Sequence, residues 1–335
     1  MKKKILISHR IPEEPLKILE SDFELIWPDN DTFSNEELSA LIPECEVVVS
    51  VFGNPLDSRL IEAASKLKLI ANYGAGTDNI DVEKATQLGI VVTNTPDTVT
   101  EPTAELAMGL IIDVARRISE FDRGLRAKKI TDWGVLQNWG TTLRDKTLGI
   151  VGLGAIGKAL AKRALAFGMK VIYHNRHKLE PHIEEQYEAR FTDLENLLRN
   201  ADFVSLNVPL TPETKSLISF PELKLMKPSA FLINTSRGAV INQEALIEVL
   251  KKKEIAGAAL DVFANEPNVP DELIYMDNVV LVPHVGSATH ETRKEMSKQV
   301  ASVIADFFQG MKGLPVVNPQ VWNSENLRFK AEGAS

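Results

Sequence analysis

Residues 147–165 read TLGIVGLGAIGKALAKRAL: a short apolar run, three spaced glycines and an alanine-rich segment with helical periodicity. Gly152, Gly154 and Gly157 form the pattern G-x-G-x-x-G. The first glycine permits a tight turn, the second lets backbone approach a pyrophosphate, and the third lets the helix pack on its strand. The stretch predicts a dinucleotide at the helix N-terminus, held by these glycines with Ala155 and Ile156. A glycine turn that serves packing alone is the alternative.

Short apolar runs alternate with helical patterns along the rest of the chain, in two blocks. In the first block the runs are 4–8, 23–27, 47–51, 67–73 and 90–93; in the second they are 147–151, 170–173, 203–208, 230–234, 256–261 and 279–283. Parallel strands need crossover helices, so this alternation predicts an α/β fold with parallel sheets rather than a sandwich or a bundle. Six strands in the second block match one dinucleotide-binding sheet.

Two long helical patterns flank the second block. One is expected at 101–120 and is apolar on most faces, and an amphipathic one is expected at 288–308. Residues 123–143 lack clear periodicity and contain Trp133 and Trp139, which predicts a long ordered loop. We therefore predict two Rossmann-like domains with parallel sheets. A coenzyme domain of residues 100–287 is inserted into a discontinuous, flavodoxin-like substrate domain of residues 1–99 and 288–335.

Composition excludes several classes of partner and location. Among 335 residues, 38 Lys and Arg stand against 46 Asp and Glu, a formal net charge of −8, which repels nucleic acid and anionic lipid. A single cysteine, Cys45, rules out an intrachain disulfide and a cysteine-based metal site, and no metal is predicted. The run after Met1 is too short for a signal peptide or a membrane span. These features predict a cytoplasmic protein.

The segment that follows the run 170–173 bears on the choice of cofactor. A fold that binds NAD usually places an Asp or Glu there for the ribose hydroxyls. Here the segment reads HNRHK at 174–178, and no acidic residue occurs from 158 to 179. We assign Asn175, Arg176, His177 and Lys178 to the cofactor and predict NADP(H) in preference to NAD(H), which stays possible, because Arg and Lys bind a 2′-phosphate. A solvated basic turn is the alternative.

A second candidate anion site lies at residues 72–78, NYGAGTD, after an apolar run of the first block. The glycines around Ala75 let successive backbone N–H groups, including that of Gly76, point into one concavity suited to a carboxylate. A structural turn would look the same.

Three further residues follow strand-like runs of the second block: Arg237, Glu266 and His284. Ligands of a parallel sheet bind outside the carboxyl ends of its strands, so these side chains should share an edge with the glycine turn. Together they suit hydride transfer to a 2-oxo acid. His284 would protonate the carbonyl oxygen, Glu266 would hold the imidazole, and Arg237 would bind the substrate carboxylate. Taken singly, each also has an ordinary structural explanation.

Four ordered motifs carry a resemblance to a known family: GLGAIG at 152–157, NTSRG at 234–238, ALDVF at 259–263 followed by EP at 266–267, and PHVGSAT at 283–289. In order and spacing the chain resembles the D-isomer-specific 2-hydroxyacid dehydrogenases over nearly its whole length. Within that family, the segments around Gly76 and Arg176 look most like the glyoxylate and hydroxypyruvate reductases.

The resemblance implies specific roles. Arg237, Glu266 and His284 would be the catalytic trio, and the backbone of Ala75 and Gly76 would bind the substrate carboxylate. The remaining cofactor contacts would come from Thr235, Ser236 and Asp261 near the nicotinamide, from Arg237 and His284, and from Val208, Pro209 and Thr214. It also implies a homodimer built on the long helices.

The expected reaction is NAD(P)H-dependent reduction of a small 2-oxo acid, with glyoxylate and hydroxypyruvate the favoured substrates. Enzymatic alternatives are a dehydrogenase for another 2-hydroxy acid, chemistry on a 3-phosphoglycerate type of substrate, and oxidation of phosphite. A different class is a non-catalytic nucleotide-sensing scaffold similar to the C-terminal-binding-protein corepressors.

Overall fold

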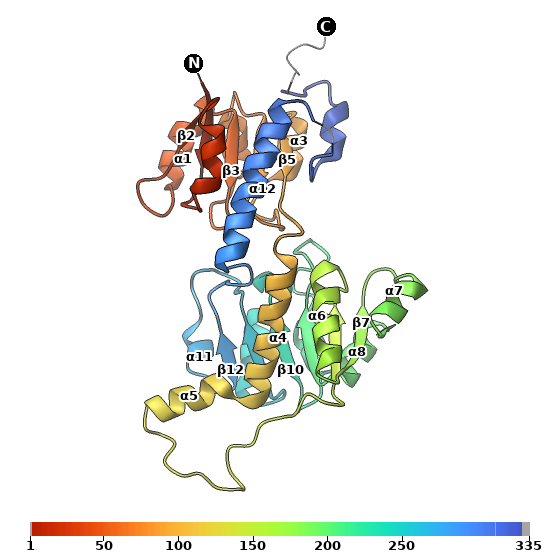
Figure 1. The fold of residues 1–335 in the computed structure, drawn as a ribbon. Helices are drawn as coiled ribbons and strands as arrows, with labels where there is room; N and C mark the ends of the chain where they lie inside the picture. The colour runs from red at the N-terminus through yellow and green to blue at the C-terminus, as the bar shows by residue number, and fades with distance from the viewer. Residues whose placement is uncertain (1, 312, 330–335) are drawn as a thin grey trace. The chain divides into compact units, whose positions relative to one another are not determined.

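The computed structural model describes residues 2–311 and 313–329. The chain divides into two compact units, Met1–Val99 with Thr289–Ser335, and Thr100–Ala288. Each unit is an α/β structure built on one parallel sheet (Figure 1). The second unit is therefore continuous in sequence and interrupts the first.

The sheet of unit Thr100–Ala288 has seven strands in the order β12-β11-β10-β9-β6-β7-β8, all parallel. The strands are β6 (Thr147–Val151), β7 (Lys170–His174), β8 (Ala189–Phe191), β9 (Phe203–Leu206), β10 (Phe231–Asn234), β11 (Gly257–Leu260) and β12 (Val279–Leu281). The order reverses between β6 and β9. In open α/β sheets, ligands bind outside the strand ends at such a reversal.

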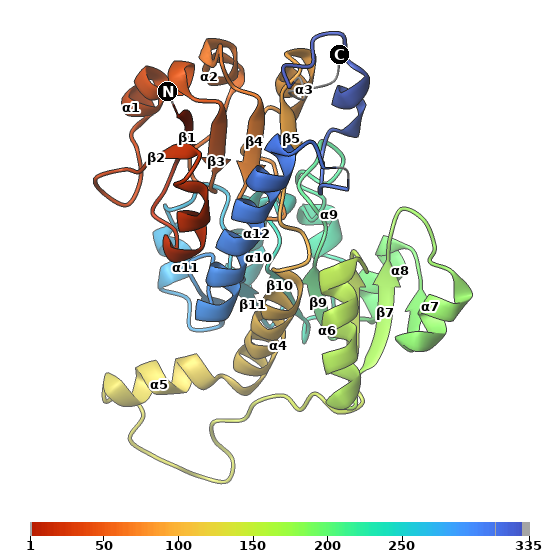
Figure 2. The ribbon, with the colours of Figure 1, turned by 45° about the horizontal axis from the view of Figure 1, so that its top comes forward.

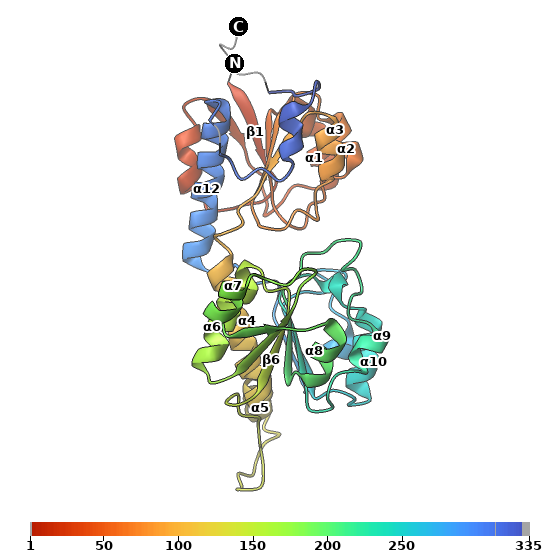
Figure 3. The same ribbon diagram turned by 90° about the vertical axis from the view of Figure 1, so that its right-hand side faces the viewer.

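Helices cover both faces of this sheet (Figure 3). One face packs against α4 (Thr100–Arg116) and α6 (Ala155–Ala166), and the other against α8 (Leu194–Asn200), α9 (Phe220–Leu223) and α10 (Gln243–Lys251). The remaining helices of the unit are α5 (Ile118–Arg126), α7 (Pro181–Gln186), α11 (Asp271–Ile274) and the 3-10 helix η3 (Gly238–Val240). With both faces covered, the central strands are mostly apolar, and β9 is buried along its whole length.

The other unit has a five-stranded parallel sheet in the order β2-β1-β3-β4-β5, the flavodoxin-like order. Its strands are β1 (Lys3–Ile7), β2 (Phe23–Ile26), β3 (Val47–Ser50), β4 (Leu69–Asn72) and β5 (Val91–Thr93). One face packs against α12 (His290–Phe308) and the 3-10 helix η1 (Glu14–Leu19), as Figure 2 shows for α12.

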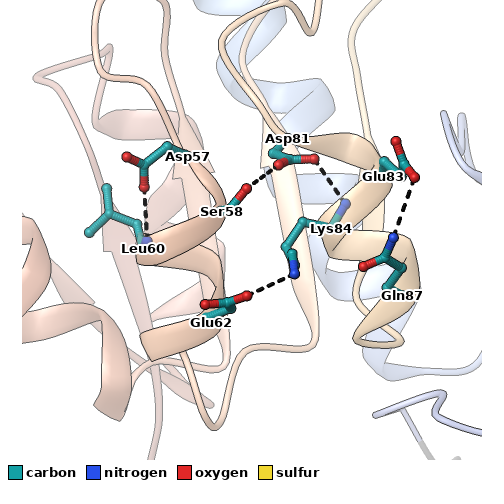
Figure 4. Close-up of polar contacts among 8 residues, drawn as sticks. All are labelled: Asp57, Ser58, Leu60, Glu62, Asp81, Glu83, Lys84 and Gln87. Carbon is teal, nitrogen blue, oxygen red and sulfur yellow. Dashed lines mark hydrogen bonds and ion pairs between the residues drawn. The ribbon is translucent and has the colours of Figure 1, made fainter.

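The opposite face of this sheet packs against α1 (Asn35–Leu41), α2 (Ser58–Ala63) and α3 (Val82–Gln87). Polar contacts join α2 to α3 (Figure 4): the Ser58 hydroxyl donates to Asp81, which caps α3, and the Lys84 ammonium lies 2.7 Å from a Glu62 carboxylate oxygen. The 3-10 helices η2 (Ile42–Glu44) and η4 (Pro319–Asn323) complete the unit. The α/β fold with two parallel sheets is thus confirmed.

The predicted single helix at 101–120 is wrong, because the chain breaks at Arg117, whose φ is 59°. In a continuous helix the Ser119 N–H would donate to the Ala115 carbonyl. Instead it donates to the Asp113 carboxylate at 2.7 Å, and the Ala115 carbonyl accepts from the Thr141 N–H at 2.7 Å. Helix α5 then continues to Arg126, so the irregular stretch starts later than predicted.

The second sheet has seven strands instead of the predicted six. The additional strand is β8, an edge strand of three residues, of which Arg190 is exposed. Three residues are too few for an alternating pattern to stand out in sequence. In the part of the chain that the structure describes, no helix has the length and apolar character to cross a bilayer.

Candidate active site

A histidine and a glutamate meet at the carboxyl edge of the seven-stranded sheet. His284 follows β12, and its Nδ1 atom lies 2.7 Å from Oε2 of Glu266, which follows β11. A carboxylate can only accept, so Nδ1 carries the hydrogen of this contact. The backbone of His284 is left-handed, with φ of 51°, which is uncommon for a residue with a side chain. Such strain persists where the surroundings hold it, and it clusters at functional sites.

The Glu266 carboxylate is held at both oxygens. Oε1 accepts a hydrogen bond from the Phe263 N–H at 3.0 Å, while Oε2 contacts His284. Burial by itself would raise the pKa of Glu266, but the hydrogen bond and charge of His284, the Phe263 N–H and the charge of Arg237 outweigh it and lower that pKa below its ordinary value. The group is therefore an ionised acceptor at neutral pH.

Asp261 fixes the backbone on which His284 sits. Its carbonyl accepts the His284 N–H at 2.8 Å, and its carboxylate accepts the N–H groups of Val285 at 2.6 Å and Gly286 at 3.0 Å. The side chain is buried, and burial raises the pKa of the Asp261 carboxyl to about 6 despite these hydrogen bonds. The backbone N–H groups of His284, Val285 and Gly286 thus all donate to Asp261.

Arg237 comes to the same edge on the segment after β10. The Asn234 side chain accepts the Ser236 N–H at 3.0 Å and donates to the Arg237 carbonyl at 2.9 Å, which shapes this turn. A Cβ atom at Gly238 would lie 1.9 Å from the carbonyl carbon of Phe263, so only glycine allows the approach. The structure therefore brings Arg237, Glu266 and His284 together on one edge of one sheet.

The glycine turn lies between β6 and α6 on this edge. Gly152 has φ of 99°, and a Cβ atom at Gly157 would lie 2.4 Å from the Gly152 carbonyl oxygen. At Gly154, by contrast, no residue beyond its chain neighbours places an atom within 4 Å of the Cβ position. The first and third glycines thus permit close packing, and the second leaves open space at the N-terminus of α6, where Ala155 and Ile156 begin the helix.

Two buried polar atoms near this turn fit a bound dinucleotide. Among the described residues, Oδ1 of Asn207, directly after β9, and Oγ1 of Thr235, directly after β10, have no hydrogen-bond partner. A buried polar atom without a partner is costly unless a ligand or water satisfies it. Ser236, the next residue of the same turn, is partly buried. The open space at Gly154 and these atoms fit a nicotinamide dinucleotide.

The basic segment after β7 is only partly available for a ligand. The Asn175 side-chain oxygen accepts the Leu153 N–H at 2.7 Å, which ties this segment to the glycine turn. The Lys178 ammonium lies 3.2 Å from a Glu184 carboxylate oxygen. Arg176 and His177 are exposed. Arg176 and His177 are therefore the residues of this segment best placed to meet a phosphate.

The segment after β9 faces Arg176. A hydrogen bond from Thr211 lowers the pKa of Glu213, and the positive charge of Arg176 contributes to the shift. The turn is closed by the Thr214 hydroxyl, which donates to the Pro209 carbonyl at 2.6 Å. The predicted contacts Val208, Pro209 and Thr214 thus lie on a turn across from the basic segment.

Ala75 and Gly76 belong to the other unit, in the loop that begins shortly after β4. The Asn72 side chain donates to the carbonyls of Gly74 and Gly76, and the Asn94 side chain donates to the carbonyl of Ala75. Among the described residues, no hydrogen bond is donated by the N–H groups of Ala75 and Gly76. The loop, residues 74–76, thus has occupied carbonyls and available N–H groups, the pattern of an anion site.

Sequence reasoning missed three asparagines that shape these sites: Asn72, Asn94 and Asn207. Asn72 ends β4, Asn94 directly follows β5 and Asn207 directly follows β9. An amide at the end of a buried strand, where the carboxyl edge of the sheet begins, is the signal that could have identified them.

Comparison with known proteins establishes the family. Residues 108–286 match the model of the D-isomer specific 2-hydroxyacid dehydrogenase, NAD binding domain. The chain belongs to this family. A glyoxylate reductase from Thermococcus litoralis is 48% identical over 329 residues, which cover 97% of this chain and 99% of that protein.

Solved structures of 2-hydroxyacid dehydrogenases and reductases share the fold over nearly the full length. A glyoxylate reductase from Paecilomyes thermophila has a TM-score of 0.86 and 33% identity, covering 95% of this chain and 99% of that chain. An NADPH-dependent glyoxylate/hydroxypyruvate reductase from Sinorhizobium meliloti, solved with NADP and malonate, has a TM-score of 0.83 and 31% identity, covering 98% and 99%. The resemblance drawn from the four motifs is confirmed.

Proposed function

We propose that the protein reduces small 2-oxo acids, glyoxylate and hydroxypyruvate above all, to 2-hydroxy acids of D configuration where the product is chiral. The observation that carries this proposal is the contact of 2.7 Å between His284 and Glu266 on the edge that also holds Arg237 and the glycine turn. With Arg237 and the glycine turn on the same edge, this contact supports a site in which an acid, an anion binder and a dinucleotide motif act at the carboxyl ends of one sheet.

Each residue then has one task. When bound, the reduced nicotinamide supplies the hydride. His284 delivers a proton from Nε2 to the carbonyl oxygen, because Nδ1 is engaged by Glu266. The ionised Glu266 stabilises the protonated ring by charge, and Arg237 binds the substrate carboxylate as a planar donor. The N–H groups of Ala75 and Gly76 are further donors that we assign to a substrate carboxylate.

We further propose that the unit Thr100–Ala288 is the coenzyme domain and that it prefers NADP(H). Two observations support the preference: no acidic residue occurs at 175–179, directly after β7, and Arg176 and His177 are exposed there. An exposed Arg binds a 2′-phosphate through paired N–H donors. The relative from Sinorhizobium meliloti was solved with NADP.

Initial rates test both proposals. Glyoxylate, hydroxypyruvate and pyruvate would each be reduced with NADPH and with NADH, following loss of the reduced cofactor. Rapid turnover of the two small polar substrates with NADPH is expected. Failure to reduce any of them while the cofactor still binds would contradict the proposed function, and faster turnover with NADH would contradict the cofactor preference.

We also propose that the protein is a homodimer that covers the apolar surface of α5 and the segment after it. Six large apolar side chains there are exposed, namely Ile118, Leu125, Trp133, Val135, Leu136 and Trp139. No residue of α5 is buried, and Figures 1 and 3 show the segment extending away from the sheet of its unit. A contiguous exposed apolar patch marks a protein interface.

Light scattering coupled to size-exclusion chromatography tests the dimer. The double variant Trp133→Ser, Trp139→Ser is expected to shift the mass from twice the chain mass toward one chain. Tyr275→Ser is the matched control, because Tyr275 is exposed in the same unit but outside this segment. A monomeric wild type would refute the proposal.

A further inference from the structure

An arginine outside the predicted site lies beside the loop at residues 74–76. Arg293 stands in the first turn of α12, and its guanidinium carbon lies 5.5 Å from the ring centroid of Phe52 and 5.9 Å from that of Tyr73. The Tyr73 hydroxyl donates to the Arg293 carbonyl at 2.6 Å. Tyr73 is the residue directly before the loop, so this hydrogen bond ties Arg293 to the loop within one unit.

Within the described part of the chain, no carboxylate balances the charge of Arg293. Its neighbours on α12, Lys294 and Lys298, each have one, at 3.7 Å from Glu14 and 3.0 Å from Glu295. Across residues 2–311 and 313–329, no carboxylate oxygen lies within 4 Å of the Arg293 guanidinium. A cation near a helix N-terminus also opposes the helix dipole. Helix stability therefore does not explain an arginine at this position.

The loop that follows Tyr73 has further donors in and beside it. The Ala75 and Gly76 N–H groups donate no hydrogen bond among the described residues, and the Thr95 N–H holds the Gly74 carbonyl at 2.9 Å. The Thr95 hydroxyl is buried and has no partner in the part of the chain that the structure describes. A ligand at this end of the sheet would meet backbone donors, a hydroxyl and a guanidinium, which together suit a polar or anionic group.

We propose that Arg293 determines substrate specificity by binding the polar group on carbon 3 of the 2-oxo acid. The inference rests on the proposed function, in which the loop N–H groups bind the C1 carboxylate. Arg293 lies beside that loop in the same unit, so its guanidinium meets the part of the substrate that extends from the bound carboxylate. A hydroxyl or a second carboxylate satisfies it, whereas a methyl group would desolvate the guanidinium without replacing its hydrogen bonds. Arg293 therefore selects hydroxypyruvate and 2-oxo dicarboxylates over pyruvate.

The test compares kcat/KM for hydroxypyruvate, oxaloacetate and pyruvate in the wild type, Arg293→Gln and Arg293→Lys. Loss of a charged hydrogen bond should lower kcat/KM of Arg293→Gln for hydroxypyruvate and oxaloacetate by roughly 10-fold to 100-fold, mainly through KM, and leave pyruvate nearly unchanged. Arg293→Lys should keep much of the activity toward oxaloacetate, since a point charge still pairs with a carboxylate. Lys294→Gln, which removes a charge from the next position, should alter none of the ratios.

A purely structural role predicts a different pattern. If Arg293 only packs on Phe52 and Tyr73, both variants would lower the melting temperature and reduce kcat/KM for all three substrates by one factor. Unchanged substrate ratios in variants that still reduce glyoxylate would overturn the inference and leave the proposed function standing. A wild type that reduces none of these acids would overturn both. If Arg293→Gln fails to fold, the test uses Arg293→Lys instead. The quantity compared is then the ratio of kcat/KM for hydroxypyruvate to kcat/KM for pyruvate.

Discussion

The Nδ1 atom of His284 and the Oε2 atom of Glu266 lie 2.7 Å apart, although 18 residues separate them in sequence. This contact orients the imidazole, and in the proposed reaction Nε2 transfers the proton. His284→Ala should therefore lower kcat by roughly two to four orders of magnitude, the range for general acid–base groups. Cofactor binding, followed by fluorescence titration with NADPH, should persist.

The control for this variant is His182→Ala, which removes an exposed histidine from α7 of the same unit. It should leave kcat unchanged. A near-normal rate in His284→Ala would remove His284 from the proposed role, and a loss of cofactor binding would show that the substitution disturbs the whole sheet edge.

Gly238 should be intolerant of any side chain. A Cβ atom there would lie 1.9 Å from the Phe263 carbonyl carbon, so Gly238→Ala must push apart the segments that hold Arg237 and Glu266. We expect kcat/KM to fall at least 100-fold, with a loss of roughly 1–3 kcal/mol in the free energy of unfolding.

Gly109→Ala is the matched control for that change. Gly109 is an exposed residue inside α4, and a Cβ atom there meets nothing within 4 Å. Alanine in a helix interior should stabilise the protein by up to about 1 kcal/mol and leave the rate unchanged. Equal behaviour of the two variants in urea unfolding and in the rate assay would contradict the close approach at Gly238.

The buried carboxyl of Asp261 predicts a pH dependence of stability. Its pKa is raised from 3.8 to about 6, so between these values the folded chain holds a proton that the unfolded chain releases. The contribution of Asp261 to the free energy of unfolding therefore falls as pH rises through this window and is constant above it. Each unit of pKa difference corresponds to about 1.4 kcal/mol, so the total change should be about 1–3 kcal/mol.

Urea unfolding of the wild type and Asp261→Asn at pH 4.5, 5.5, 6.5 and 7.5 measures this effect, since the variant cannot ionise at position 261. The wild type minus variant difference should decrease from pH 4.5 to pH 6.5 and then level off. A difference that does not vary with pH would show that the carboxyl titrates in its ordinary range.

The local pattern of apolar runs and helical segments in the sequence was sufficient to predict the two parallel sheets. The alternation of strand and helix is a property of short segments, and the glycines of residues 152–157 each take the predicted part in the turn: positive φ at Gly152, open space at Gly154 and close packing at Gly157. The shared edge of Arg237, Glu266 and His284 follows from the parallel order alone.

Features that depend on distant contacts could not be predicted. The helix break at Arg117 is stabilised by the Thr141 N–H on the Ala115 carbonyl, a contact that no local pattern encodes. Likewise, the loop at residues 74–76 is held partly by Asn94, which lies 19 residues from the Ala75 carbonyl that it binds. The position of Arg293 beside this loop could not be predicted either, because α12 lies more than 200 residues after β4 in sequence.

The proposed preference for NADP(H) depends mainly on one side chain of the basic segment after β7. Lys178 is held 3.2 Å from Glu184, whereas Arg176 is exposed and its charge reaches the turn after β9. Arg176→Ala should therefore raise KM for NADPH by roughly 10-fold or more and leave KM for NADH nearly unchanged, since only NADPH carries the 2′-phosphate.

The control is Lys178→Ala, which removes the same charge two residues away. Because the Lys178 ammonium is already paired with Glu184, this variant should raise KM for NADPH less. Steady-state kinetics with both cofactors at saturating glyoxylate decides the matter. Equal effects of Arg176→Ala on the two cofactors would mean that Arg176 is a solvated turn residue.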